Sequence, residues 1–212
     1  MARNTKEEAL ETRTRILDAA ENVFYEKGVA RTSLDDIAKA ASVTRGAIYW
    51  HFKNKSDLFS AMCDRVKVPF EQAAQANAAE GLADPMASMR KGCIFFLKEA
   101  VSNPHSRKVF EIMLHKCEFV EANEPIASKQ RECFSRGTAT IETILKNVVA
   151  KGQLPADLDI PMAANLMHAT LDGLLNNWLF TPGAFDLAAN AERLVDACLD
   201  TLRNAPSLRK QA

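Results

Sequence analysis

Residues 33–59 read SLDDIAKAASVTRGAIYWHFKNKSDLF. Ser33 is followed three positions later by Asp36, a spacing that is typical of the capping box at the start of a helix. We therefore expect a short helix over 34–41, whose dipole the acidic residues of the first turn favour. Thr44 can cap the next helix, because its side-chain oxygen can accept a hydrogen bond from an amide of the first turn. The stretch thus predicts two short helices separated by a tight turn.

The second of these helices, expected over 44–51, has one face suited to a protein core. Ile48 and Phe52 are four positions apart and therefore lie on the same side of the helix. Two short helices joined by a tight turn form a helix-turn-helix, in which the later helix lies in the major groove of DNA. We place this helix-turn-helix at about 33–52.

The remaining side chains of this helix suit DNA. Arg45 can read guanine O6 and N7 bidentately, and Gly46 and Ala47 are small enough for a close approach to base edges or a thymine methyl group. The residues alone leave an alternative open, in which the rings at positions 49–51 only pack against one another in a small helical domain. Phosphate contacts fix register without reading sequence, and the side chains suited to them are Tyr49, His51 and Lys55.

The rest of the chain is expected to be helical as well. Only 8 Gly and 8 Pro interrupt it, and the intervals between them show helical rather than alternating periodicity. We predict an all-α fold of about nine helices with no strand, and we expect Pro69 to kink or end its helix. Besides the two short helices, the predicted segments are residues 6–27, 56–69, 84–102, 107–118, 124–152, 161–180 and 186–203.

The balance of charges restricts any nucleic-acid surface to a local patch. The chain has 27 Lys and Arg and 27 Asp and Glu, so no net charge of either sign attracts a polyanion. Residues 1–55 carry 10 Lys and Arg and 8 Asp and Glu, which is only a small local excess of positive charge. Contact with DNA must therefore come from the placement of a few side chains.

Composition also bounds the class of protein. With 212 residues, 47% of them hydrophobic and 25% charged, the chain has the make-up of an ordinary globular protein. No run approaches the roughly 18 apolar residues of a membrane-spanning helix, and the first ten residues carry charges where a signal peptide would be apolar. We therefore expect a cytoplasmic protein with no membrane partner.

The five cysteines, at positions 63, 93, 117, 133 and 198, are scattered, odd in number and without any CxxC pair. This pattern argues against a disulfide framework and against a structural zinc site. We expect reduced, mostly packed thiols, and we expect neither a metal nor a cofactor.

The quoted stretch and its flanks resemble the signature of TetR-family transcriptional regulators. The match spans residues 10–70 and is specific across this whole N-terminal head. Similarity continues in HKCEF (115–119), LPADL (154–158), NWLF (177–180) and FDL (185–187). These segments resemble the branch of AcrR and TtgR, which are repressors of multidrug-efflux pump operons.

The resemblance implies a homodimer whose two heads bind a pseudo-palindromic, double-stranded operator. It also implies that small hydrophobic effectors release this dimer from the operator. Residues 1–56 would form the DNA-binding domain, and residues 57–212 would bind the effector and dimerise through helices at about 161–180 and 186–203. Ser42 departs from the pattern, because relatives commonly have glycine there and serine is costlier in a left-handed conformation. The family's DNA contacts fall on Thr44, Arg45, Gly46, Ala47, Tyr49, Trp50, His51 and Lys55.

A polar stripe marks the expected effector site. His168, Asp172 and Asn176 recur every four residues on an otherwise apolar helix, where polar groups need partners. From the residues alone, the stripe either meets solvent or a neighbouring chain, or orients a mainly apolar ligand in a cavity. The resemblance favours the cavity, although core packing stays an alternative for each aromatic residue or Met near it. The residues that it implies are Val66, Phe70, Met89, Cys93, Phe96, Phe110, Leu114, Phe134, Ile141, His168, Leu171, Asp172 and Asn176.

Catalysis finds little support in the sequence. The chain has no GxGxxG, GxSxG or HExxH, and its four histidines are dispersed. His115 and Cys117, with Glu111 or Glu118, could form a metal or nucleophile site, but helical residues two apart point to different faces. We therefore expect no catalytic residue and no enzyme. The alternatives to a ligand-responsive repressor are a DNA-binding regulator or structural protein without an effector, and a helical enzyme.

Overall fold

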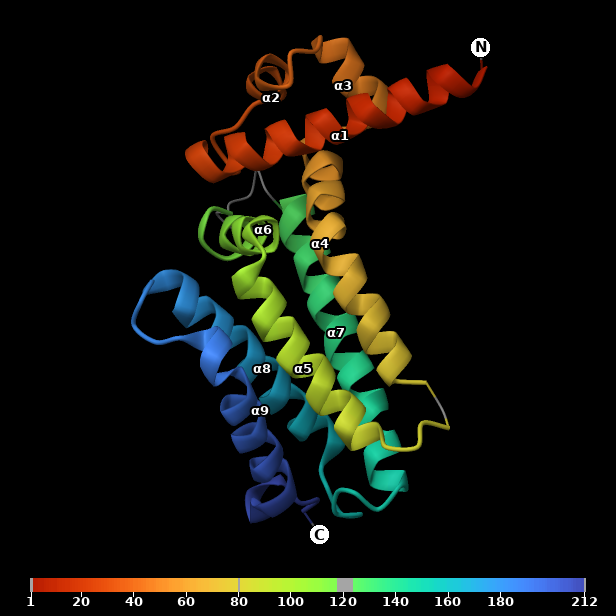
Figure 1. Cartoon of the computed structure of the whole chain (residues 1–212), viewed down its shortest axis with the longest axis vertical. Helices are drawn as coiled ribbons and strands as arrows, with labels where there is room; N and C mark the ends of the chain where they lie inside the picture. The colour runs from red at the N-terminus through yellow and green to blue at the C-terminus, as the bar shows by residue number, and fades with distance from the viewer. Residues whose placement is uncertain (1, 80, 118–123, 212) are drawn as a thin grey trace. The chain divides into compact units, whose positions relative to one another are not determined.

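The computed structural model describes residues 2–79, 81–117 and 124–211. Within these ranges the chain forms nine α-helices and one 3-10 turn, and its only β contact is an isolated bridge between Leu158 and Arg209. The prediction of an all-α fold with about nine helices is therefore confirmed. In chain order (Figure 1) the helices are α1 (Ala2–Lys27), α2 (Leu34–Ala40), α3 (Arg45–His51), α4 (Lys55–Asn77), α5 (Pro85–Ser102), α6 (Pro104–His115), α7 (Glu124–Ala150), α8 (Ile160–Phe180) and α9 (Leu187–Asn204).

Helix α4 was expected to kink or end at Pro69. An end there is wrong, because the helix continues through that residue to Asn77. A proline inside a helix leaves the carbonyl of the residue four positions earlier without its amide partner. Pro69 is exposed, so water can reach this side of the helix and satisfy the freed carbonyl.

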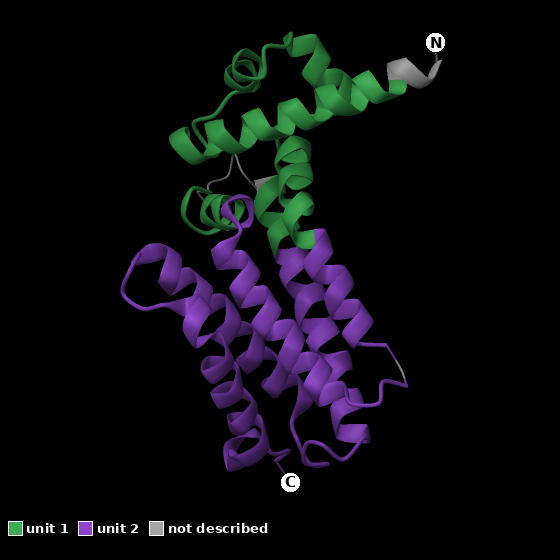
Figure 2. Ribbon diagram, in the orientation of Figure 1, with its two compact units in different colours: residues 1–67, 107–130 green, residues 68–106, 131–212 purple. Residues whose placement is uncertain are grey.

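The chain divides into two compact units (Figure 2). The first consists of residues 1–67 and 107–130, and the second of residues 68–106 and 131–212. The sequence predicted a boundary after residue 56 between the DNA-binding domain and the effector-binding domain. That functional boundary stays a prediction. The two units are described in turn.

The core of the first unit is built by α1, the two short helices and the start of α4. Phe24 of α1 is fully buried and meets the edge of Phe59 of α4 at 5.7 Å between ring centroids. Ile37 of α2 and Ile48 of α3 are fully buried as well. Burial of each such side chain contributes about 1.5–3 kcal/mol, which attaches the two short helices to α1.

The predicted capping box at the start of α2 is confirmed. The Ser33 hydroxyl oxygen accepts a hydrogen bond from the Asp36 amide at 3.1 Å, and the Asp36 carboxylate accepts one from the Ser33 amide at 3.0 Å. Lys27, at the end of α1, donates to the same carboxylate at 2.7 Å. The hydrogen bonds from Lys27, and then from Ser33, hold the pKa of Asp36 well below its ordinary value. The start of α2 is therefore stabilised by the ion pair between Lys27 and Asp36 as well as by the hydrogen bonds of the capping box.

The turn between α2 and α3 has the left-handed residue expected at position 42. Ser42 has a φ of 53°, and it is the only described non-glycine residue with a positive φ. Its amide donates to the Lys39 carbonyl at 3.1 Å, and the Val43 amide donates to the Ala38 carbonyl at 3.0 Å. This pair of bonds is the Schellman ending of a helix, in which glycine usually holds the left-handed position.

The core of the second unit lies among α5, α7, α8 and α9. It is formed by buried aliphatic side chains such as Leu97 of α5, Leu145 of α7, Ala164 of α8 and Leu199 of α9. None of the helices in the described ranges has the length and apolar character needed to cross a membrane.

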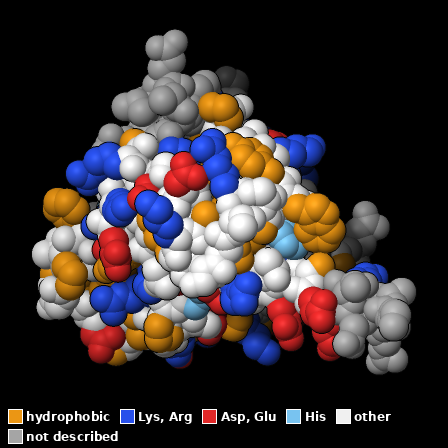
Figure 3. All heavy atoms as spheres, turned by 90° about the horizontal axis from the view of Figure 1, so that it is seen from above, with side chains coloured by type: hydrophobic (Ala, Val, Ile, Leu, Met, Phe, Trp, Pro, Cys, Tyr) orange, Lys and Arg blue, Asp and Glu red, His pale blue; other side chains and the backbone are white. Residues whose placement is uncertain are grey.

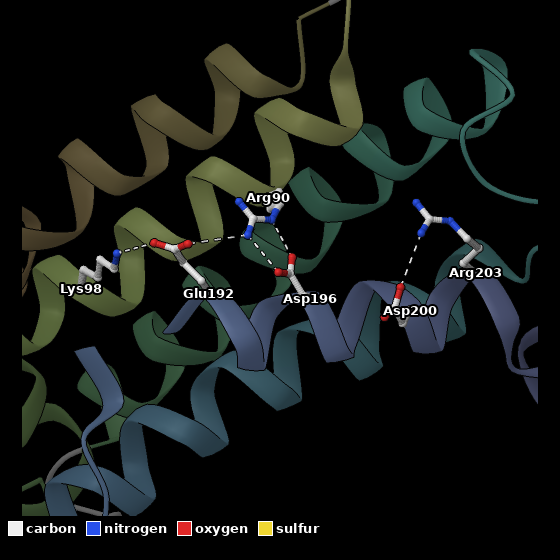
Figure 4. Close-up of polar contacts among 6 residues, drawn as sticks. All are labelled: Arg90, Lys98, Glu192, Asp196, Asp200 and Arg203. Atoms are coloured by element: carbon white, nitrogen blue, oxygen red, sulfur yellow. Dashed lines mark hydrogen bonds and ion pairs between the residues drawn. The ribbon is translucent and has the colours of Figure 1, made fainter. Parts of the chain in front are cut away.

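Ion pairs hold α5 along α9 in this unit (Figure 4). Arg90 donates to both carboxylate oxygens of Asp196, one of them at 2.9 Å, and Lys98 donates to Glu192 at 2.8 Å. The hydrogen bond from Arg90 lowers the pKa of Asp196, and the hydrogen bond from Lys98 lowers the pKa of Glu192. The spacing of Glu192 and Asp196 by one turn lets α9 present both carboxylates to the same face of α5.

We predict that Ser42→Gly stabilises the protein. Glycine adopts a positive φ without the clash of a Cβ atom, and after allowance for its freer unfolded chain the gain should be about 0.5–1 kcal/mol. Urea denaturation followed by circular dichroism measures the change in the free energy of unfolding. Ser42→Ala is the matched control, because it keeps the Cβ atom and should give no such gain. Equal stability of the glycine and alanine variants would contradict the assigned strain.

Candidate functional sites

Helix α3 begins where the sequence predicted. Thr44 caps it, since its hydroxyl oxygen accepts a hydrogen bond from the Ala47 amide at 3.1 Å. Ile48 is fully buried and Phe52 is 2% exposed, as their four-residue spacing indicated. The buried pair fixes which side of α3 faces the core and leaves the opposite side to solvent.

The solvent side of α3 carries aromatic and basic groups. Trp50 is 73% exposed and Tyr49 is 49% exposed, so neither ring is part of a packed core. Arg45 is exposed and donates hydrogen bonds to the Tyr49 hydroxyl at 3.2 Å and to the Asp35 carboxylate at 3.1 Å. Because this ion pair is exposed, its net stabilisation is small, and a guanine edge or a phosphate can replace Asp35 as the partner of Arg45.

His51 is placed differently from its neighbours. Its ring meets the Trp50 ring edge-on at 4.5 Å between centroids. Burial, and then the nearby charge of Arg13, lowers the pKa of His51 below its ordinary value of 6.5. The neutral form of the ring is therefore favoured, and in that form a phosphate contact from His51 would use an N–H group without a charge.

Lys55 has partners inside the protein. Its ammonium group donates to the carbonyl oxygens of Val29 at 2.8 Å, Ala30 at 3.2 Å and Thr32 at 3.1 Å. These three residues lie in the connection between α1 and α2. Burial lowers the pKa of Lys55. The expected phosphate contact of Lys55 stays a prediction. In the structure this side chain also bonds the start of α4 to the connection between α1 and α2.

Basic and acidic side chains are mixed on the face of the molecule seen in Figure 3, where blue and red atoms lie among one another. The small excess of Lys and Arg in residues 1–55 therefore does not gather into one continuous basic area there. An approaching duplex would be positioned by individual side chains and helix ends.

A cavity of about 590 Å³ lies within the second unit. Its walls come from α4, α5, α7 and α8, and most of the lining residues are apolar. Among them is an aromatic cluster in which the Phe70 ring lies 5.2 Å from Phe96 and 5.8 Å from Phe95, centroid to centroid. Cavities of this size and character are the usual sites of small organic ligands.

Small residues create much of this space. Ala73 and Ala74 of α4 and Ala78 just after it line the cavity, and so do Gly137 and Ala139 of α7. Larger side chains at the alanines would occupy part of this volume, whereas an added Cβ at Gly137 would meet the His168 ring at 3.1 Å. The stretch 72–80 is visibly rich in Ala and Gln, so the sequence contained this signal, which periodicity of large apolar residues does not detect.

Six of the thirteen residues expected near an effector line the cavity, namely Phe70, Met89, Cys93, Phe96, Ile141 and Leu171. The other seven do not line it. Val66, Phe110 and Leu114 belong to the first unit, and Phe134, His168, Asp172 and Asn176 belong to the second. The roles of all thirteen residues in ligand binding stay predictions.

The polar stripe on α8 has partners outside the cavity lining. The His168 ring stacks on Phe134 at 4.3 Å between centroids, and its Nδ1 atom lies 2.7 Å from the Thr138 hydroxyl. Nε2 of the same ring lies 3.6 Å from the Asp172 carboxylate. The first half of the stripe therefore attaches α8 to α7 of the same chain, an arrangement that the sequence did not predict.

The charged residues of the cavity lining were missed from the sequence. They are Glu71 of α4 and Arg136 of α7, whose Oε1 and Nη2 atoms lie 3.5 Å apart. Each lies on a long helix whose partner cannot be read from periodicity, so nothing in the chain marked them as neighbours. They add two opposite charges to a mostly apolar lining.

The metal site considered at His115 and Cys117, with Glu111 or Glu118, has no counterpart in the described ranges. Within them, no three His, Cys, Asp or Glu side chains group in a way that could hold a metal ion. Glu118, one of its proposed members, lies outside the described residues.

Both parts of the chain match known families of regulators. Residues 16–62 match the family described as bacterial regulatory proteins, tetR family, and residues 84–204 match the C-terminal region of MAATS-type transcriptional repressors. This chain belongs to the TetR family. The resemblance stated from the sequence is therefore confirmed, and TetR-family proteins are transcriptional regulators rather than enzymes.

Individual TetR-family relatives match over nearly the whole chain. The HTH-type transcriptional regulator TtgR of Pseudomonas putida is 44% identical over 210 residues, which cover 99% of this chain and 100% of TtgR. The structure of NalD, the secondary repressor of the MexAB-OprM multidrug efflux pump in Pseudomonas aeruginosa, superposes with a TM-score of 0.84 at 33% identity, covering 93% of this chain and 99% of NalD. The complex of SmeT, from Stenotrophomonas maltophilia, with triclosan gives a TM-score of 0.85 at 33% identity, covering 95% and 96% of the two chains.

We predict that Arg45→Ala lowers operator affinity and relaxes the preference at one base position. Loss of a bidentate contact to guanine should reduce discrimination there by about 1–3 kcal/mol. Binding to matched operators and to operators mismatched at single positions measures the effect. Equal weakening of specific and nonspecific DNA would show that Arg45 does not read a base.

Lys55→Ala is the comparison for this measurement. A phosphate contact carries no sequence information, so this change should weaken binding to all sequences similarly. It should also lower the free energy of unfolding, because three part-buried carbonyl oxygens lose a donor. Lys53→Ala, at an exposed position, should leave stability unchanged.

Proposed function

We propose that this protein represses the operon of a multidrug-efflux pump, and that small hydrophobic compounds release it from double-stranded operator DNA. Its membership of the TetR family and its similarity to NalD, a repressor of an efflux pump, support the regulated target. The similarity to SmeT, whose structure holds triclosan, supports the kind of effector. The observation that carries the proposal is the apolar cavity of about 590 Å³ in a chain that also has a helix-turn-helix.

In the proposed complex with DNA, α3 enters the major groove with its solvent side towards the bases. Arg45 exchanges the Asp35 carboxylate for a guanine edge, and the adjacent small residues permit close approach. Backbone phosphates accept hydrogen bonds from groups on either side of α3 and at the start of α4. The residues proposed to contact DNA are Thr44, Arg45, Gly46, Ala47, Tyr49, Trp50, His51 and Lys55.

In the proposed dimer, α8 and α9 of one protomer pack on the same helices of its partner. Phe180 is 77% exposed and Met162 is 51% exposed in the single chain, so both ends of α8 present apolar side chains. A dimer would bring two α3 helices to successive major grooves on one face of DNA, which recur about every 34–36 Å. An effector then needs only to stabilise a dimer geometry with another spacing between the heads.

The dimer is testable without any ligand. We expect sedimentation of the wild type as a dimer at micromolar concentration. Leu194→Arg on α9 would bury an unpaired charge in the proposed interface and should shift the protein towards monomers. Ala76→Arg adds the same charge at an exposed position of α4 and should sediment like the wild type. A monomeric wild type that still binds its operator tightly would overturn the interface.

The effector site is testable by filling it. Ala74→Leu extends a side chain into the cavity, and we expect it to weaken binding of hydrophobic compounds at least about tenfold, which corresponds to about 1.4 kcal/mol. Ala76→Leu, on the same helix but exposed and outside the lining, is the matched control. A panel of phenolics, dyes and antibiotics is titrated by calorimetry, and operator release is followed in parallel. If no compound of the panel binds the wild type, the regulator without an effector becomes the better description.

A further inference from the structure

We infer that Asp35 is a specificity-determining residue of the helix-turn-helix, because it holds Arg45 in an ion pair and so withholds this guanidinium from the phosphates of non-operator DNA. This inference rests on the proposed function, since it specifies how the same DNA-binding face distinguishes an operator from other sequences. It depends on the way in which Arg45 is held, on the freedom of Asp35 from the cap of α2, and on the few positive charges of the head.

Arg45 is held at both terminal nitrogens of its guanidinium group. Nη1 donates to the Asp35 carboxylate at 3.1 Å, and Nη2 donates to the Tyr49 hydroxyl at 3.2 Å. The Tyr49 ring lies one turn further along α3, with its centroid 5.6 Å from the guanidinium carbon. A bidentate contact to guanine also uses two N–H groups of the guanidinium. The partners within the protein therefore engage the nitrogens with which Arg45 would contact DNA.

Asp35 is not the acid that caps its helix. The capping box of α2 is formed by Ser33 and Asp36, and Lys27 donates to Asp36 as well. The Asp35 carboxylate instead bonds to Arg45, ten positions later in the chain and on the next helix. Helix α2 therefore keeps its cap when Asp35 is replaced, so the effect of this carboxylate on DNA binding can be measured in a folded protein.

The ion pair changes the choice of partners for Arg45 more than it changes stability. The Arg45 side chain is 56% exposed and the Asp35 side chain is 54% exposed, and exposed pairs contribute little to the free energy of unfolding. A phosphate that took Arg45 would lie beside the Asp35 carboxylate, which would have lost its cation. The two negative charges would repel each other, so Asp35 opposes the transfer of Arg45 to phosphate.

A guanine edge does not meet this opposition. Its O6 and N7 atoms are neutral acceptors that together accept two hydrogen bonds from one guanidinium. The contact with Asp35 is a single hydrogen bond, so guanine offers Arg45 more bonds than it gives up and brings no negative charge to Asp35. Asp35 therefore weakens the contact of Arg45 with phosphate more than its contact with guanine.

The head has few positive charges to spare for non-operator DNA. Residues 1–55 carry 10 Lys and Arg and 8 Asp and Glu, and nonspecific affinity comes almost entirely from contacts between cations and phosphates. Lys55, another cation of the head, already donates to three carbonyl oxygens. Withholding Arg45 from phosphate therefore lowers nonspecific affinity and raises the ratio of specific to nonspecific binding.

The test compares two duplexes of about 30 base pairs, a length that holds two half-sites. The wild type selects one of them from a pool of random sequence, and the other has the same bases in shuffled order. Fluorescence anisotropy measures the affinity of the whole protein for each duplex at several salt concentrations. Asp35→Asn should raise affinity for the shuffled duplex about fivefold, because Arg45 becomes free to contact phosphate. Affinity for the selected duplex should rise less than about twofold, because an exposed ion pair costs little to break.

A double-mutant cycle shows whether Asp35 acts through Arg45. In the Arg45→Ala background, Asp35→Asn should change affinity for the shuffled duplex less than about twofold, since no guanidinium is left to release. With Arg45 present, the same change should steepen the salt dependence of binding to the shuffled duplex by about 0.9 for each head that gains a phosphate contact. Asp18→Asn is the matched control, because it breaks another exposed Asp–Arg pair of the head, with Arg65 at 2.6 Å, and it should leave the ratio of the two affinities unchanged. Circular dichroism and thermal unfolding establish that each variant is folded.

The outcomes separate this inference from the proposed function. An equal rise in affinity for both duplexes, or the same rise in the Arg45→Ala background, would show that Asp35 only repels DNA and would overturn the inference. Unchanged binding of both duplexes would overturn it as well. A loss of affinity for the selected duplex alone would overturn it in favour of Asp35 as a residue that orients Arg45 towards guanine. In these cases the proposed function stands, whereas a wild type that binds selected and shuffled duplexes equally would overturn both.

Discussion

The head of this protein depends on one ammonium group. Lys55 is the first residue of α4, and it donates to three carbonyl oxygens in the connection between α1 and α2. Two shorter-range bonds lie in the same connection, from the Thr32 hydroxyl to the Gly28 carbonyl at 2.7 Å and from the Gly28 amide to the Phe24 carbonyl at 2.9 Å. A third joins the Val29 amide to the Lys116 carbonyl at 2.9 Å. Lys55 alone supplies three donors to this connection from α4, and a carbonyl without a donor is costly, so this side chain ties the start of α4 to the segment that leads into α2.

The features that the sequence predicted well are set by neighbours in the chain. The caps at Ser33 and Thr44, and the left-handed turn at Ser42, each involve groups within five residues of one another. Such interactions obey fixed spacings and can be read before any tertiary structure is known. The resemblance to the TetR family then supplied the topology into which these local elements fit.

The features that sequence reasoning missed depend on which long helices meet. Glu71 and Arg136 are 65 positions apart, and periodicity shows the face on which each lies but not what that face contacts. His168 and Asp172 lie on one face of α8, as their spacing indicated, but the stacking of the His168 ring on Phe134 of α7 could not be read from the sequence. Lys55 likewise had the chemistry of a phosphate contact, while its three backbone partners lie more than 20 residues away.

The small residues that line the cavity expose this protein to a particular kind of genetic change. Filling an apolar void generally improves packing and stability. A variant with a larger side chain at Ala73, Ala74 or Ala139 should therefore fold normally and resist proteolysis. Such a variant would persist at normal abundance but would lose the proposed response to an effector. One substitution that leaves the fold intact would therefore be enough to remove the proposed induction.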